Sequence, residues 1–168
     1  GWDPTDTHTT ADNFWQELYS GSGTSIDTGV AGITAKKYLW IQIYLNGLTS
    51  ATTMKAVLNG DIGANYALRR SQDGAADETF VNNSLGLYYH GGTSSEDELF
   101  VNMFIINNLA NEKLAMSNSV FSTAAGAGTS PNREEVVNKW SNTSSQITDI
   151  ELTGTYGSNS IMKIWGSN

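Results

Sequence analysis

The stretch Lys37-Tyr38-Leu39-Trp40-Ile41-Gln42-Ile43-Tyr44-Leu45 decides the fold class. Its residues are mostly β-branched or aromatic, and their period of two predicts a β-strand. One face of this strand carries only aliphatic side chains, from Leu39, Ile41, Ile43 and Leu45. The other face carries three aromatic rings and one amide, from Tyr38, Trp40, Gln42 and Tyr44. Because three rings do not make an ordinary solvated face, we expect a loop, another subunit or a ligand to cover it.

A second strand with the same alternation is predicted over residues 99–106. Its odd-numbered positions are all aliphatic or methionine, whereas its even-numbered positions include two rings and an amide. Since a strand turns every second side chain to the same side, one register can bury the apolar faces of both strands together. The residues predicted to face inward are Leu39, Ile41, Ile43, Val101, Met103 and Ile105.

Further segments of strand composition are separated by turns rich in Gly, Asn and Ser. They lie at residues 14–19, 54–58, 66–70, 79–81, 85–90, 113–121, 134–140, 147–152 and 161–165. A short helix capped by residues 10–13 is the alternative for the first segment, and the glycine cluster after it favours the strand. The pattern predicts an all-β fold, an antiparallel, jelly-roll-like β-sandwich of about nine or ten strands. We expect one domain over residues 14–168 and an extended N-terminal arm over residues 1–13.

The composition is that of one folded domain with a polar, weakly charged surface. The 168 residues include no cysteine, and Gly, Ser, Thr and Asn together make up about two in five. Apolar residues make up 39%, which is not the composition of a disordered chain. A net charge of −8 repels phosphate backbones and anionic lipids. We therefore expect no nucleic acid and no membrane as partner.

The sequence carries no motif that points to catalysis, so we expect a protein that is not an enzyme and needs no cofactor. His8 falls in the arm and His90 at a strand end, without a Gly-x-Ser-x-Gly motif. Glu134 and Glu135 are adjacent on a predicted strand and point to opposite faces, which is the wrong geometry for a shared acid/base site. The acidic segment 73–78, from Asp73 to Glu78, is either a calcium loop or a solvated hairpin turn, and its spacing favours the turn.

Aromatic residues are the strongest candidates for a binding role. Sugars present C–H faces to aromatic rings, so Tyr88, Tyr89 and His90 are candidates for stacking on a glycan. Core packing is the competing interpretation for each ring, because burying it removes a large apolar area from water. The candidate contacts with an assembly partner are Trp2, Tyr38, Trp40 and Tyr44.

The N-terminal arm offers one route to such an assembly. Residues 1–13 reach about 40 Å when fully extended, and Trp2 is a large anchor near the tip of a polar segment. An exchange of arms in a closed ring would bury Trp2 on a neighbouring subunit. The alternative is that Trp2 folds back onto its own domain.

Most of the chain resembles a group of small β-sandwich proteins that marine tailed phages and related environmental viruses encode. The resemblance is carried by residues 6–12, 33–39, 65–69, 111–128, 131–140, 142–147 and 161–166. The first and last of these read Asp6-Thr7-His8-Thr9-Thr10-Ala11-Asp12 and Ile161-Met162-Lys163-Ile164-Trp165-Gly166. None of these segments contains a catalytic signature, and the group has no site motif whose residue roles could be carried over.

The resemblance implies a non-enzymatic structural protein on the virion surface, of the capsid decoration, head-fibre or tail-associated type. It also implies an extracellular location, with identical subunits and major capsid or tail proteins as partners. The alternative function is a carbohydrate-binding module or a lectin-like receptor-binding domain for a cell-surface glycan, because one fold serves many functions.

Overall fold

The computed structural model of this chain describes residues 14–48, 53–89, 98–122 and 124–168. The described residues form eleven β-strands and contain no helix. The strands are β1 (Gln16–Ser22), β2 (Tyr38–Asn46), β3 (Thr53–Leu58), β4 (Tyr66–Gln72), β5 (Glu78–Asn82), β6 (Leu85–Tyr89), β7 (Glu98–Ile106), β8 (Lys113–Ser122), β9 (Asn132–Trp140), β10 (Ile150–Thr153) and β11 (Ile161–Ser167). The predicted all-β class is confirmed. The expected count of nine or ten strands was too low, because even the shortest candidate segments pair with a neighbour.

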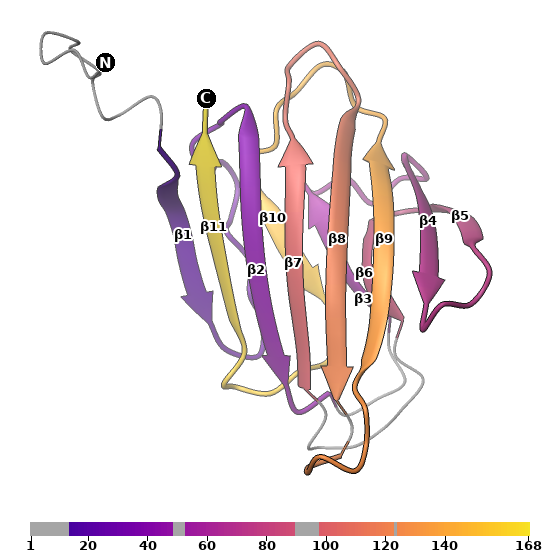
Figure 1. Cartoon of the computed structure of the whole chain (residues 1–168). Helices are drawn as coiled ribbons and strands as arrows, with labels where there is room; N and C mark the ends of the chain where they lie inside the picture. The colour runs from indigo at the N-terminus through magenta and orange to yellow at the C-terminus, as the bar shows by residue number, and fades with distance from the viewer. Residues whose placement is uncertain (1–13, 49–52, 90–97, 123) are drawn as a thin grey trace, which may run out of the picture.

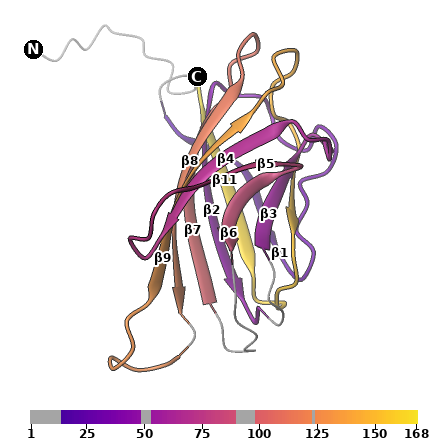
Figure 2. The same ribbon diagram turned by 90° about the vertical axis from the view of Figure 1, so that its right-hand side faces the viewer.

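The strands form two antiparallel sheets of unequal size, which make a β-sandwich. The larger sheet has eight strands in the order β1-β11-β2-β7-β8-β9-β4-β5, and the smaller has three in the order β10-β3-β6. Figure 1 looks onto the larger sheet, with the smaller sheet behind its central strands. Figure 2 shows that the larger sheet is strongly twisted, since β4 and β5 run steeply across the direction of β7. One broad face of the larger sheet therefore points away from the sandwich.

The hydrophobic core lies between the two sheets. The six residues predicted to face inward are all buried, with no side chain more than 3% exposed. The register of β2 and β7 places Ile41 opposite Met103 and Ile43 opposite Val101, so one face of each strand is buried, as the alternation predicts. The smaller sheet closes the core from the other side with Met54, Ala56, Leu58, Leu85, Leu87, Ile150 and Leu152.

The first strand begins later than the sequence indicates. Segment 14–19 was predicted as a strand, and β1 covers residues 16–22 instead, with Phe14 and Trp15 before it. The helix alternative for this segment is wrong, because β1 pairs with β11 along its whole length. The pairing has a bulge between Glu17 and Tyr19, which shifts the register by one residue.

A buried asparagine holds the irregular segment 141–149 onto the larger sheet. The Asn107 amide nitrogen donates hydrogen bonds to the carbonyl oxygens of Lys36 (3.0 Å) and Ile147 (3.2 Å). Its amide oxygen accepts a hydrogen bond from the backbone N–H of Ile147 at 2.6 Å. Asn107 is fully buried, so these bonds satisfy backbone groups that water does not reach. The segments before β2 and before β10 are thereby tied to the end of β7.

A buried tyrosine links β4 to the turn before it. The Tyr66 hydroxyl donates a hydrogen bond to the Asp61 carbonyl oxygen (2.9 Å) and accepts one from the Leu58 backbone N–H (3.2 Å). Its ring lies nearly parallel to the Trp140 ring, with 6.2 Å between centroids. Burial raises the pKa of Tyr66 to about 12, because ionisation would place a negative charge inside the core.

This raised pKa predicts a loss of stability at alkaline pH that Tyr66→Phe reduces. Below pH of about 10 the phenol is neutral in both the folded and the unfolded chain. Between pH of about 10 and 12 the unfolded chain loses this proton while the folded chain keeps it, so the free energy of unfolding falls as pH rises. Urea unfolding at pH 9, 10 and 11 measures the slope. Some slope persists in the variant, because the pKa values of Tyr19 and Tyr156 are also raised, mainly by burial. If the free energy of unfolding fell with pH at the same slope in the wild type and in Tyr66→Phe, the raised pKa of Tyr66 would be contradicted.

Candidate interaction surface

The outer face is defined here as the surface of the eight-stranded sheet that points away from the smaller sheet (Figure 1). The registers align its side chains in rows that cross β11, β2, β7, β8 and β9 in that order, and each row is named by its β2 residue. The Tyr38 row is Ser167, Tyr38, Ile106, Leu114 and Lys139. The Trp40 row is Trp165, Trp40, Phe104, Met116 and Val137. The Gln42 row is Lys163, Gln42, Asn102, Asn118 and Glu135. The Tyr44 row is Ile161, Tyr44, Phe100, Val120 and Arg133.

Three of the four rows are mainly apolar and exposed. Met116 is 60% exposed, Phe104 41% and Tyr38 39%. The exposed large apolar side chains on this surface are Trp15, Tyr38, Phe100, Phe104, Leu114, Met116, Val120, Val137 and Ile161. Single exposed apolar residues are common, but the adjacent Tyr38 and Trp40 rows form a patch across five strands, and such a patch marks a surface at which a soluble protein binds a partner.

An aromatic cluster forms the centre of the Trp40 row. The Trp40 ring lies 5.9 Å from Phe104 at an angle of only 9°, and 4.8 Å from Trp165. Trp15, which precedes β1, folds over this row and contacts both Trp40 (6.0 Å, edge to face) and Phe104 (6.3 Å). Offset and edge-to-face contacts of this kind hold rings in fixed orientations. The cluster is therefore a rigid apolar projection from the outer face.

Hydrogen bonds orient two of the rings on the outer face, those of Trp40 and Tyr44. The Trp40 indole N–H donates a hydrogen bond to the Asn102 side-chain oxygen at 2.6 Å, which joins the Trp40 and Gln42 rows. The Tyr44 hydroxyl donates one to the Glu98 carboxylate at 2.7 Å. This bond to Glu98, with a smaller effect of burial, raises the pKa of the Tyr44 hydroxyl. Tyr38, Trp40 and Tyr44, three of the four predicted assembly contacts, thus lie on one surface.

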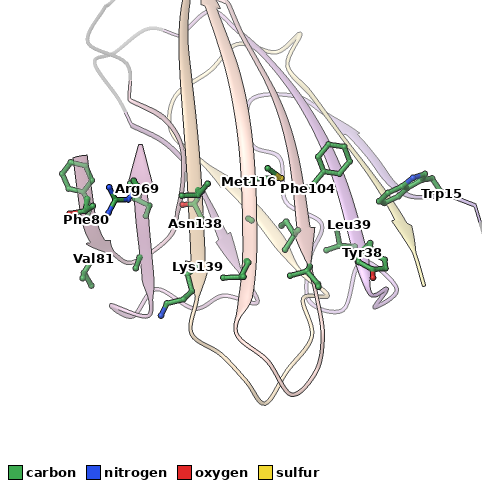
Figure 3. Close-up of a pocket in the computed structure, with 18 residues that line it drawn as sticks. Trp15, Tyr38, Leu39, Arg69, Phe80, Val81, Phe104, Met116, Asn138 and Lys139 are labelled. Carbon is green, nitrogen blue, oxygen red and sulfur yellow. The ribbon is translucent and has the colours of Figure 1, made fainter. Parts of the chain in front are cut away.

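A wide groove runs across the outer face beside the aromatic cluster (Figure 3). Its volume is about 890 Å³, and its floor includes Phe104, Met116 and Val137. Figure 3 shows Trp15 at one end of the groove and Val81 of β5 at the other. The lining is predominantly apolar, and its charged residues are Arg69 and Lys139. The outer face therefore carries both a projection and a hollow.

Strand β8 reverses the usual arrangement of apolar and polar side chains. Its outward positions carry Leu114, Met116 and Val120, whereas serines occupy two of its inward positions. The buried Ser119 hydroxyl donates a hydrogen bond to the Glu134 carbonyl oxygen at 3.3 Å, which satisfies it inside the sandwich. Hydrophobic alternation identifies such a strand correctly but assigns its faces the wrong way round.

A second, smaller cleft of about 500 Å³ lies on the inner side, between β5 and β6. Its exposed ring is Phe80, which is 44% exposed and has the Arg70 guanidinium 5.4 Å from its centroid. Arg70 forms ion pairs with Glu78 (2.6 Å) and with the buried Glu134 (3.4 Å). The cleft thus places hydrogen-bonding groups beside an aromatic face.

Of the three residues predicted to stack on a glycan, the structure describes the side chain of Tyr88. Tyr88 is only 2% exposed, and its ring packs nearly parallel to the Phe121 ring at 4.9 Å. The interpretation of Tyr88 as a stacking platform is corrected by this burial, since the ring belongs to the core. The side chain of Tyr89 and the whole of His90 lie outside the described residues, as do Trp2 and the arm over residues 1–13.

The acidic segment 73–78 forms the hairpin turn that the sequence favoured. It joins β4 to β5, with positive φ values of 51° at Asp73 and 80° at Gly74. Asp77 pairs with Arg69 at 2.9 Å, so this carboxylate already has a cationic partner. Among the described residues, no group of three or more His, Asp or Glu could hold a metal ion. Glu134 is buried and Glu135 exposed, so the two carboxylates point to opposite faces as predicted.

The part of the chain that the structure describes contains no helix able to cross a membrane. No protein-family model matches the chain, and no curated protein matches its sequence.

Proposed function

We propose that this protein is a non-enzymatic structural component of a virion surface, and that its outer face attaches it to other protein subunits. The observation that carries this proposal is the exposure of three apolar rows on one rigid sheet. Covering such a face removes apolar area from water, and this is the main driving force of protein association. The resemblance to phage β-sandwich proteins supplies the setting of capsid decoration, head fibre or tail.

The architecture suits attachment better than chemistry. The outer face is a hydrogen-bonded sheet whose rings are already fixed by their contacts, so binding costs little conformational entropy. The chain contains no cysteine, so its stability does not depend on the redox state of its surroundings. Rings that are fixed before binding and a stability that does not depend on redox state both suit a subunit of an external particle.

Peptide mass spectrometry of virus particles purified by density gradient, from a culture that carries this gene, tests the proposal. We expect the protein in the particle fraction, in a constant ratio to the major capsid protein across independent preparations. The protein in the soluble lysate alone, with particles that lack it, would overturn the structural role. A nonstructural protein released by lysis serves as the control for carry-over.

Carbohydrate binding is the second candidate function, and the inner cleft favours it. Phe80 presents an exposed ring beside Arg70 and Glu78, and rings next to hydrogen-bonding groups are the usual elements of a sugar site. Binding to a glycan array that Phe80→Ala removes, and that Phe100→Ala on the outer face leaves intact, would support this function. Phe100 is a matched control because its exposure, 43%, is close to that of Phe80.

A further inference from the structure

We propose that the outer face binds the outer face of a second copy of this chain, about a two-fold axis that runs along β7. This inference rests on the proposed function, since it names the partner of the same surface. It follows from the order of residues within the rows, which is self-complementary about β7.

The axis along β7 determines which residues meet. Strand β7 is the middle strand of the five that carry the rows, with β2 and β11 on one side and β8 and β9 on the other. A two-fold axis parallel to β7, in the plane between two stacked sheets, places each row against the same row of the second copy. It also places β2 over β8 and β11 over β9. Such an interface is isologous, which is the arrangement of most homodimers.

The charges at the ends of two of the four rows become complementary under this rotation, whereas Lys139 and Arg133 at the ends of the other two lie opposite Ser167 and Ile161. In the Gln42 row, Lys163 on β11 lies opposite Glu135 on β9 of the second copy. In the Trp40 row, which extends to Glu17 on β1 and to Arg69 on β4, the rotation brings Glu17 opposite Arg69. Each of these groups also has an exposed partner in its own chain, such as Glu17 for Lys163 at 3.7 Å. Exposed pairs of this kind contribute little and leave the groups available for a second partner.

The polar and apolar groups between these ends also match. Within the Gln42 row the rotation places Gln42 opposite Asn118 and Asn102 opposite itself, so amides meet amides. Within the Trp40 row it places Trp40 opposite Met116 and Phe104 opposite itself. No polar row meets an apolar row, because each row meets its own copy.

The shape of the outer face is also self-complementary about the two-fold axis along β7. Trp15 lies over β2 and β7 at one end of the groove, and the groove extends past β7 over Met116 and Val137. The rotation moves the Trp15 projection of one copy to the position of the groove in the other. Each copy therefore supplies one projection and one hollow, and the two contacts are equivalent.

The size of the face fits a specific dimer. Five strands about 4.8 Å apart and four rows about 6.8 Å apart give a patch of about 24 Å by 27 Å. Two such patches bury on the order of 1,300 Å², within the usual range of specific interfaces. Two packed sheets cross at about 30°, so residues on their outer strands are displaced from an exact opposition. The long side chains of Lys, Arg and Glu span this displacement. The repulsion between two copies of charge −8 is screened at physiological salt.

A charge exchange across the predicted pair tests this geometry. Sedimentation equilibrium of the full chain is measured for the wild type, Lys163→Glu, Glu135→Lys and the double variant. We expect a dimer for the wild type, a dissociation constant raised at least tenfold by each single change, and recovery to within about threefold of wild type in the double variant. Glu151→Lys, on the exposed side of β10, makes the same charge change as Glu135→Lys away from the interface and is expected to leave the constant unchanged.

Three outcomes would overturn the proposal. A wild-type protein that stays monomeric, or that forms only larger oligomers, contradicts the two-fold dimer. Single variants that weaken association without recovery in the double variant contradict the pairing of Lys163 with Glu135. Unchanged association in all charge variants contradicts the axis along β7. None of these results bears on whether the protein is found in virus particles, so the failure of the dimer and the failure of the structural role are distinguishable.

Discussion

Phe104→Lys is expected to convert the associated protein into monomers, with an affinity loss of at least about 100-fold, or about 2.7 kcal/mol. Phe104 lies at the centre of the Trp40 row, where the two-fold axis brings it against its own copy. The change would place two ammonium groups together in an apolar interface, where neither finds a counter-charge, and an unpaired buried charge costs several kcal/mol. Sedimentation equilibrium measures the loss.

The matched control is Val30→Lys. Val30 is an exposed apolar residue between β1 and β2, outside the sheet, and its replacement makes the same charge change. We expect this variant to associate like the wild type. Because Phe104 is partly exposed in the single chain, we expect Phe104→Lys to keep its thermal unfolding midpoint within a few degrees of wild type. Equal association of the two lysine variants would show that Phe104 is not at an interface.

Asn107→Leu is expected to lower the free energy of unfolding by about 3–6 kcal/mol. The leucine has a similar volume but forms no hydrogen bonds, so two carbonyl oxygens and one N–H, from Lys36 and Ile147, lose their partners in the core. Each unsatisfied buried group costs about 1–3 kcal/mol. Urea unfolding at neutral pH measures the difference. The neighbouring Asn108 is only partly buried, and we expect Asn108→Leu to change the free energy by less than about 1 kcal/mol. A similar small loss for both variants would contradict the role of Asn107.

The sequence predicts the fold well where apolar alternation and burial agree. Strands β2 and β7 have aliphatic residues or methionine on every inward position, so their buried faces and six core residues follow from the pattern alone. The same alternation predicts the outward rings Tyr38, Trp40 and Tyr44, and hence a surface that needs a partner.

The sequence does not predict features that depend on neighbouring strands. In β8, hydrogen bonds from Ser117 and Ser119 to the backbone of β9 let serines be buried and apolar residues be exposed, and these bonds need the register of the sheet. Trp15 was assigned to a strand, but it folds over the Trp40 row because β1 begins only at residue 16. Tyr88 was proposed for glycan stacking from its neighbours in the sequence, whereas its burial is decided by Phe121, far along the chain.

The self-complementary order of the rows is even harder to predict from the sequence than the faces of a single strand. Lys163 and Glu135 are on strands that are distant in the chain, and their equivalent positions about β7 emerge only from four successive strand pairings. Antiparallel pairing with a fixed register is what places five separate segments into one ordered surface.

Oxidation of Met116 is the most direct test of the central claim that the outer face is covered by another subunit. Of the four methionines, Met54, Met103 and Met162 are fully buried and only Met116 is exposed in the single chain, so hydrogen peroxide reports on this face alone. Peptide mass spectrometry follows the rate of sulfoxide formation at a concentration at which the wild type is associated and Phe104→Lys is not. We expect Met116 to oxidise at least tenfold more slowly in the wild type, and we expect dilution below the dissociation constant to remove the difference. Equal rates in the two proteins at every concentration would contradict it.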